Sequence, residues 1–395
     1  MASPAPPTAG PQALALLPTL TDELLEEIFL RLPTPADVAR ASAACPSFRR
    51  IITGRSFLRR LHAIQPPPLL GFAAYEGFHP AQPPHPSAPL ARAFADAADF
   101  SYSFVPAGRW LTPWHPRDVR QGRVLLECTP ECDPAFEYYD TVLLRDLDLA
   151  VCDPLSRRYS LLPRIPKNLR GQHKHLIGFG LFLAPTGEDD EETTFRVVCV
   201  ACNKTMVVVF EFTSITGEWH IPAYLSCNSL GTVMTDTRLE LSIVNKDLAN
   251  CHMPDSGKPL IVLGRDRTPE VFFLADCFGD GPTDIIRITK QNGSGSSDAW
   301  QFENMISLPT QYNYFTLGTA DGFLFLRGIL QDENSGYSSE DSSDNSVHLQ
   351  AESPDVEYFS LDVKTRECKK VCVMKQYYTV HSYFGYPPPL AKPTI

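Results

Sequence analysis

The hydrophobic period of this sequence changes once, at Pro66-Pro67-Pro68. Before these prolines, between Leu17 and Leu61, apolar residues recur at the spacing typical of helices. After them, from Leu69 onward, short alternating apolar runs are separated by Gly, Pro, Asp and Asn, which is typical of strands and turns. The 395 residues therefore divide into a small helical part and a large part made almost entirely of strands.

Helix start and stop signals divide the helical part. The spacing predicts a first helix over Asp22–Leu32, which Pro33 ends. Thr34 is predicted to cap a second helix over Pro35–Ala43, and Pro46 opens a third helical stretch that continues toward Leu61. The first helix carries a wide apolar stripe made of Leu24, Leu25, Ile28, Phe29 and Leu32.

Three short helices of this length form only a marginal core, so their remaining apolar face needs a partner. Two interpretations stay open from the periodicity alone. The face packs against the following part of the chain, or it binds another protein.

The larger part contains about sixteen candidate strands with hardly a helix between them, Phe100–Val105 among them. This pattern argues against βαβ units and favours a sandwich, a barrel or a propeller. A strand, a polar turn and a second strand recur at Leu149–Tyr159, Val209–Trp219 and Tyr358–Cys368. This repetition favours a β-propeller, and at about 40–50 residues per blade it would have roughly six to eight blades.

The predicted fold is therefore a multidomain α+β chain: a three-helix module followed by a large all-β domain. Residues 1–16 are rich in Ala and Pro and are predicted to be disordered, residues 17–65 form the helical module, and residues 66–395 form the β domain. Within the β domain, residues 331–355 hold many Ser, Asp and Glu and no Lys or Arg, which predicts an acidic disordered loop. We interpret this loop and the acidic run Glu188–Glu192 as solvated segments.

Charge and hydropathy narrow the class of partner. The net charge of −11 and the pI near 5.4 argue against a nucleic-acid-binding protein, which needs a concentrated basic surface. No apolar run approaches the roughly 20 residues that cross a bilayer, and the N-terminus lacks the basic start of a signal peptide. We therefore expect no membrane partner and a location in the cytoplasm, the nucleus or both. The eleven scattered cysteines do not suggest a disulfide framework.

No group of residues predicts catalysis, a cofactor or a metal site. Cys199 and Cys202 have the spacing of zinc ligands but lie in an apparent strand, where they would point to opposite faces. Core cysteines are the better interpretation. His173 and His175 share a strand face but have no identifiable third ligand. We therefore expect a chain that is not an enzyme.

The helical part resembles the F-box. Leu20–Pro33 is similar to the first half of the F-box pattern, and Asp37–Arg40 with Cys45, Phe48, Arg49, Ile51 and Ile52 is similar to the second half. Thr21 stands where the family usually has Pro, Pro46 where it usually has Lys, and Phe48 where it usually has Trp.

Two stretches of the larger part resemble plant F-box proteins with a C-terminal kelch-like or F-box-associated propeller. Val151–Pro166 is similar to their blade signature, and Thr319–Leu326 is similar to their recurrent Asp-Gly strand opening.

These resemblances imply a substrate-recognition subunit of an SCF (cullin–RING) E3 ubiquitin ligase. The F-box would dock on the adaptor subunit, and through it on the cullin, while the β domain would recruit a target protein for ubiquitination. The implied adaptor-facing or module-core residues are Leu20, Leu24, Leu25, Ile28, Phe29, Leu32, Pro33, Val38, Cys45, Phe48, Ile51 and Ile52. Two alternatives stay open: a propeller enzyme with a site in the central channel, and a protein-binding scaffold that does not act in a ligase.

Overall fold

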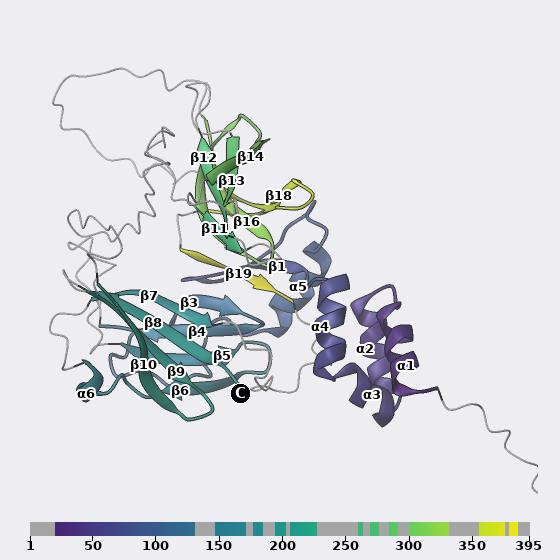
Figure 1. The fold of residues 1–395 in the computed structure, drawn as a ribbon, viewed down its shortest axis with the longest axis horizontal. Coiled ribbons are helices and arrows are strands. Elements are labelled where there is room, and N and C mark those ends of the chain that lie inside the picture. The colour runs from purple at the N-terminus through teal and green to yellow at the C-terminus, as the bar shows by residue number, and fades with distance from the viewer. Residues whose placement is uncertain are drawn as a thin grey trace, which may run out of the picture. The chain divides into compact units, whose positions relative to one another are not determined.

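The structure is a computed structural model. It describes residues 20–130, 147–170, 177–184, 194–202, 206–226, 260–263, 269–275, 284–290, 300–331, 355–375 and 379–385. The described residues divide into two compact units that meet in sequence between Pro67 and Pro68. We call them the helical unit and the β unit (Figure 1). The predicted N-terminal tail, the acidic run Glu188–Glu192, His173, His175 and nearly all of the predicted acidic loop lie outside the described residues.

The helical unit contains four helices where the periodicity predicts three. They are α1 (Asp22–Leu30), α2 (Pro35–Ala44), α3 (Pro46–Ile52) and α4 (Arg55–Ile64). The third predicted stretch is interrupted at Thr53 and Gly54, where the Thr53 hydroxyl donates to the carbonyl of Arg49 at 2.8 Å. Gly54 is extended and occupies the N-cap position just before α4. Because the apolar spacing continues across this break, periodicity could not reveal it.

Strands of the β unit form four-stranded antiparallel sheets in which each strand pairs with the next along the chain (Figure 1). The first sheet contains β3 (His115–Arg120), β4 (Arg123–Cys128), β5 (Asp148–Asp153) and β6 (Arg158–Leu162). The second contains β7 (Ile177–Ala184), β8 (Arg196–Cys202), β9 (Met206–Thr213) and β10 (Glu218–Ser226).

Two further four-stranded sheets follow the same order among the described residues. One contains β11 (Leu260–Leu263), β12 (Pro269–Ala275), β13 (Asp284–Lys290) and β14 (Trp300–Ser307). The other contains β15 (Tyr312–Ala320), β16 (Phe323–Leu330), β17 (Val356–Asp362) and β18 (Cys368–Met374). The predicted region of many antiparallel strands is therefore confirmed, and the number of blades stays a prediction.

A fifth sheet joins the two ends of the β unit. The last strand, β19 (Val380–Phe384), pairs with the first, β1 (Leu69–Ala74), which also pairs with β2 (Gly77–Pro80). In Figure 1 the yellow β19 accordingly lies beside β1. A strand from the end of the unit thus completes the sheet that its start begins.

The hairpins predicted from the repeated pattern are present and use one kind of turn. Asp153, the last residue of β5, accepts hydrogen bonds from the backbone N–H groups of the residues two and three positions later, and Asp362, the last residue of β17, does the same. Four positions after each aspartate, Arg157 and Arg366 adopt left-handed backbone conformations with φ of 56° and 60°. Gly217 occupies the matching position between β9 and β10 with φ of 69°. All three turns connect the third and fourth strands of a sheet.

The first and second strands of two sheets are joined by two-residue turns. Gln121-Gly122 connects β3 with β4, and Asp321-Gly322 connects β15 with β16. Both residues of each turn have positive φ, which matches the twist of the flanking strands and suits glycine at the second position. The Asp-Gly opening recognised in the sequence is thus a hairpin turn.

Neighbouring sheets pack through apolar side chains on both of their faces. Phe72 of β1 lies in one cluster with Leu126 of β4 and with Phe325 and Tyr358 of β16 and β17. Its ring centroid is 5.5 Å from that of Phe325 and 5.7 Å from that of Tyr358. The opposite face of the first sheet packs on the β7–β10 sheet, and the β11–β14 sheet packs on the β15–β18 sheet.

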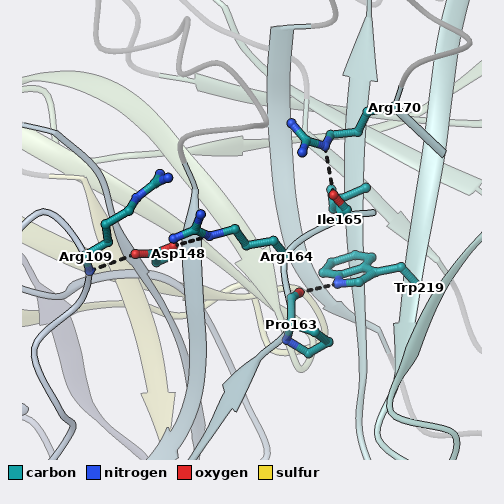
Figure 2. Close-up of polar contacts among 7 residues, drawn as sticks. All are labelled: Arg109, Asp148, Pro163, Arg164, Ile165, Arg170 and Trp219. Carbon is teal, nitrogen blue, oxygen red and sulfur yellow. Dashed lines mark hydrogen bonds and ion pairs between the residues drawn. The ribbon is translucent and has the colours of Figure 1, made fainter. Parts of the chain in front are cut away.

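Polar contacts also tie the first sheet to the second. The Asp118 carboxylate on β3 accepts a hydrogen bond from the Leu183 N–H on β7 at 2.7 Å. The Trp219 indole N–H on β10 donates to the Pro163 carbonyl at 2.6 Å, as Figure 2 shows. Because buried polar groups are costly when unpaired, these bonds fix the relative position of the two sheets.

The prediction of a strand at Phe100–Val105 is wrong. The Asp99 carboxylate accepts hydrogen bonds from the backbone N–H and the hydroxyl of Ser101, and Tyr102 has a φ of 56°. The segment is therefore a series of turns whose aromatic side chains enter the core. The structure also contains α5 (Ala88–Ala97), which contacts β1 and β2, and the short α6 (Lys167–Arg170), neither of which the sequence pattern predicts.

Candidate functional site

Three large apolar side chains are exposed on α1 and just before it. Leu24 and Ile28 lie one helical turn apart, and Leu20 precedes the helix. The exposed fractions are 51% for Leu20, 52% for Leu24 and 46% for Ile28. A row of exposed leucine and isoleucine at this spacing is suited to burial against another protein. We call these three residues the α1 surface.

The opposite side of α1 forms the core of the helical unit. Phe29 and Leu30 are buried there, together with Val38 of α2, Ile51 and Ile52 of α3, and Phe57, Leu58 and Leu61 of α4. The Phe29 ring meets Phe48 edge to face at 5.0 Å and Phe57 at 6.4 Å. Since the core holds α1 from one side, the α1 surface is presented by a fixed helix.

Charged side chains fasten α1 to the helices behind it. Asp22 forms an ion pair with Arg50 of α3 at 2.7 Å. Arg60 of α4 pairs with Glu26 at 3.1 Å and with Glu27. The hydrogen bond from Arg60 lowers the pKa of Glu27. The acidic residues of α1 thus position the helix as well as complement its dipole.

Capping residues set the starts of α2 and α3. The Thr34 hydroxyl oxygen accepts a hydrogen bond from the Asp37 N–H at 3.2 Å, which confirms the predicted cap. The Cys45 sulfur accepts from the Phe48 N–H at 3.5 Å, and Pro46 occupies the first turn of α3, where no hydrogen bond is lost. The first turns of α2 and α3 are therefore compatible with proline.

The structure sorts the predicted residues into two sets, which periodicity left mixed. Four of them are exposed: Leu20, Leu24, Ile28 and Pro33. The others are buried or partly buried: Leu25, Phe29, Leu32, Val38, Cys45, Phe48, Ile51 and Ile52. The prediction omitted Leu30, Phe57, Leu58 and Leu61, which share this core. Their helical spacing to Phe29 and Ile51 was the available signal.

Comparison with known protein families identifies the helical unit. The model of the family described as the F-box domain matches residues 17–60. These residues form an F-box domain. The α1 surface and the core behind it therefore belong to the F-box, and α4 extends it by a few residues beyond the matched range.

No curated protein matches the chain. Solved structures that match part of the chain show low similarity. An endo-1,4-beta-xylanase from Bacteroides thetaiotaomicron is 11% identical, covers 63% of this chain and 68% of its own, and has a TM-score of 0.24. The GH43_1 enzyme from Xanthomonas citri complexed with xylotriose is 9% identical, with coverage of 72% and 79% and a TM-score of 0.28. The Nup133 beta-propeller domain of Vanderwaltozyma polyspora is 13% identical, with coverage of 54% and 51% and a TM-score of 0.20. At this level of similarity the matches assign no fold, activity or substrate to this chain.

Within the part of the chain that the structure describes, no group of three or more His, Cys, Asp or Glu could hold a metal ion. The interpretation of Cys199 as a core cysteine is confirmed, because its side chain is fully buried and burial raises the pKa of its thiol to about 12. Cys128, Cys152 and Cys372 are buried as well. Among the described helices, none has the length and hydropathy needed to cross a bilayer.

Proposed function

We propose that this chain is the substrate-recognition subunit of an SCF (cullin–RING) E3 ubiquitin ligase. Its F-box docks on the adaptor subunit and through it on the cullin, and its β unit recruits a target protein. The observation that supports this proposal best is the α1 surface. There the F-box exposes Leu24 and Ile28 on a helix held by its own core, and Leu20 just before that helix.

The contribution of the chain to ubiquitination is proximity and not catalysis. Holding a target near the ubiquitin-charged conjugating enzyme raises the effective concentration of its lysines. In this proposal the chain needs no cofactor and works in the cytoplasm, the nucleus or both.

The β unit is proposed to be a propeller of the kelch-like or F-box-associated type found in plant F-box proteins. The repeated four-stranded sheets, the recurring hairpin turns and the pairing of β19 with β1 support this part of the proposal. In closed propellers the last strand often completes the first blade, and closure removes exposed sheet edges.

The test is co-purification of the full chain with an SCF adaptor subunit. Leu24→Asp combined with Ile28→Asp places two charges on the α1 surface without touching the core, and we expect adaptor affinity to fall by at least about tenfold. Leu90→Asp is a matched control, since Leu90 is 52% exposed on α5 of the β unit. Absence of binding by the unchanged chain, or equal binding by the double variant, would refute the proposal.

A further inference from the structure

The end of α4 contacts α1 through residues that lie at, or just beyond, the limit of the F-box match. We define the α4 anchor as Arg60, the last matched residue, together with Leu61 and Gln65, which follow the match. We propose that the α4 anchor holds α1 in the position that the adaptor subunit binds, and that Gln65 is a positioning residue for this docking. The inference rests on the proposed function, because it concerns how the F-box engages the adaptor.

Gln65 ties the end of α4 to the turn between α1 and α2. Its side-chain Nε2 donates a hydrogen bond to the Leu32 carbonyl at 2.7 Å, although the two residues are 33 positions apart in the sequence. Leu32 lies two residues after the end of α1 and immediately before Pro33. A carbonyl can only accept, so this contact requires the donor that the amide nitrogen supplies.

The backbone around Gln65 sets the point from which its side chain reaches Leu32. The Gln65 N–H donates to the Leu61 carbonyl at 2.7 Å and so completes the last turn of α4. Pro66 follows, and the residue before a proline is disfavoured in the helical conformation. Gln65 accordingly leaves the helix with a φ of −124° and a ψ of 84°.

The other two residues of the α4 anchor contact α1 itself. Arg60 pairs with Glu26 at 3.1 Å and with Glu27. Leu61 is only 2% exposed and belongs to the core cluster that contains Phe29. Together with Gln65, the α4 anchor therefore contacts the chain both before and after Ile28, which is part of the α1 surface.

These contacts order the docking surface before the adaptor arrives. Ile28 and Pro33 are both exposed and lie between or beside the residues that the α4 anchor contacts. A surface that is already ordered loses less conformational entropy on binding. If α1 adopts its docking position for only a fraction of the time, the apparent affinity falls by that fraction.

Gln65 can be altered without removing a part of the apolar core. It is half-buried, and it lies outside the cluster formed by Phe29, Phe57 and Leu61. Loss of its hydrogen bond should therefore leave the four helices folded and should release the turn that contains Leu32 and Pro33.

The test measures the affinity of the full chain for a purified SCF adaptor subunit by biolayer interferometry. Gln65→Met keeps the length of the side chain but removes the donor, and we expect the affinity to fall by about three- to tenfold. Gln65→Lys supplies a donor again and should return the affinity to within about twofold of the unchanged chain.

Ile64→Ser is the neighbouring control. Ile64 is the last residue of α4, is 59% exposed and lies outside the core cluster. This substitution should leave the affinity unchanged. Hydrogen–deuterium exchange on the same samples should show faster exchange over residues 31–38 in Gln65→Met, with unchanged protection over residues 57–61.

Four outcomes would overturn the inference. Gln65→Met binds the adaptor as tightly as the unchanged chain, or Gln65→Lys does not recover the affinity that Gln65→Met loses. Loss of helical circular dichroism in Gln65→Met would show that Gln65 is needed for folding and not for positioning. An equal loss of affinity in Ile64→Ser would show that this end of α4 touches the adaptor directly.

The unchanged chain distinguishes this inference from the proposed function. If the unchanged chain binds the adaptor and Gln65→Met binds equally well, only the role of Gln65 is refuted. If the unchanged chain does not bind the adaptor, the proposed function is refuted as well.

Discussion

The Tyr383 hydroxyl donates a hydrogen bond to the Gly122 carbonyl at 3.0 Å. Tyr383 lies on β19, the last strand of the β unit, and Gly122 lies in the turn between β3 and β4. The Tyr383 ring is buried among Phe78, Phe94 and Phe100. This contact links β19, which completes the β19–β1–β2 sheet, to the sheet formed by β3 to β6.

Tyr383→Phe should therefore destabilise the β unit by about 1–2 kcal/mol, because it leaves the Gly122 carbonyl without this donor while the ring packing is kept. Urea unfolding of the full chain measures the change. Tyr159→Phe removes the same atom from a tyrosine that is 39% exposed and should have almost no effect. Equal effects of the two substitutions would contradict the role assigned to Tyr383.

Arg157 and Arg366, which have left-handed backbone conformations in the hairpin turns, are expected to give an increase in stability when they are replaced. Arg157→Gly and Arg366→Gly should each raise the stability of the β unit by up to about 1 kcal/mol, because glycine tolerates positive φ. Arg158→Gly, one residue later in β6, should lower stability instead, since glycine weakens a strand. Thermal unfolding of the three variants measures the difference, and a loss of stability in all three would show that the turns need their side chains.

We expect His381 to make the β19–β1–β2 sheet sensitive to acid. Burial, with Arg117 adding to it, lowers the pKa of His381 from 6.5 to about 4. Between pH 6.5 and 4 the histidine binds a proton in the unfolded chain but not in the folded chain. The free energy of unfolding is therefore highest above pH 6.5 and decreases as the pH falls toward 4. The loss from this group alone amounts to up to about 3 kcal/mol.

His381→Asn should flatten that loss, as measured by urea unfolding at about pH 7 and about pH 5. Burial also lowers the pKa of His79 and of His115, so part of the acid sensitivity should remain in the variant. If the free energy of unfolding decreases equally with pH in the variant and in the unchanged chain, His381 is excluded as a source of the acid sensitivity.

The F-box core and the α1 surface should respond to substitution in different ways. Phe29→Ala removes the ring that meets Phe48 and Phe57, and we expect a loss of about 3–5 kcal/mol, enough to unfold a unit this small. Leu24→Ser changes an exposed side chain and should leave helicity intact while weakening adaptor binding. Circular dichroism and co-purification together separate the two effects. Loss of helical signal in Leu24→Ser would place Leu24 in the core.

Much of the helical unit could be predicted because its signals are local. Pro33, Thr34 and Pro46 act through their own backbone geometry, so the region where α1 ends and the starts of α2 and α3 follow from the sequence. Which apolar residues face outward depends on where α3 and α4 pack. Leu24 and Leu25 are adjacent and equally apolar, yet only Leu25 contacts the core.

In the β unit, repeated hairpins were visible because a polar turn between two alternating runs is also a local signal. The pairing of β1 with β19 was not visible, since strands so far apart along the chain are brought together only by the whole arrangement of sheets. Phe100–Val105 misled the prediction because alternating aromatic and serine residues suit a strand and a series of serine turns equally well. The hydrogen bonds that Asp148 accepts from the Arg109 backbone N–H and from the Arg164 side chain join two loops to β5, which no spacing could indicate.

The pairing of β1 with β19 also sets an order of events during synthesis. The F-box is synthesised before the β unit and has its own core, whereas β1 needs Val380–Phe384 before its sheet is complete. Under the proposed function, a product that terminates early, before β19, would still occupy the adaptor while presenting no finished target-binding unit. The truncated chain from a nonsense or frameshift mutation late in the coding sequence would then act as a dominant inhibitor of the ligase. The same kind of mutation before the codons of α1 would cause only a loss of function.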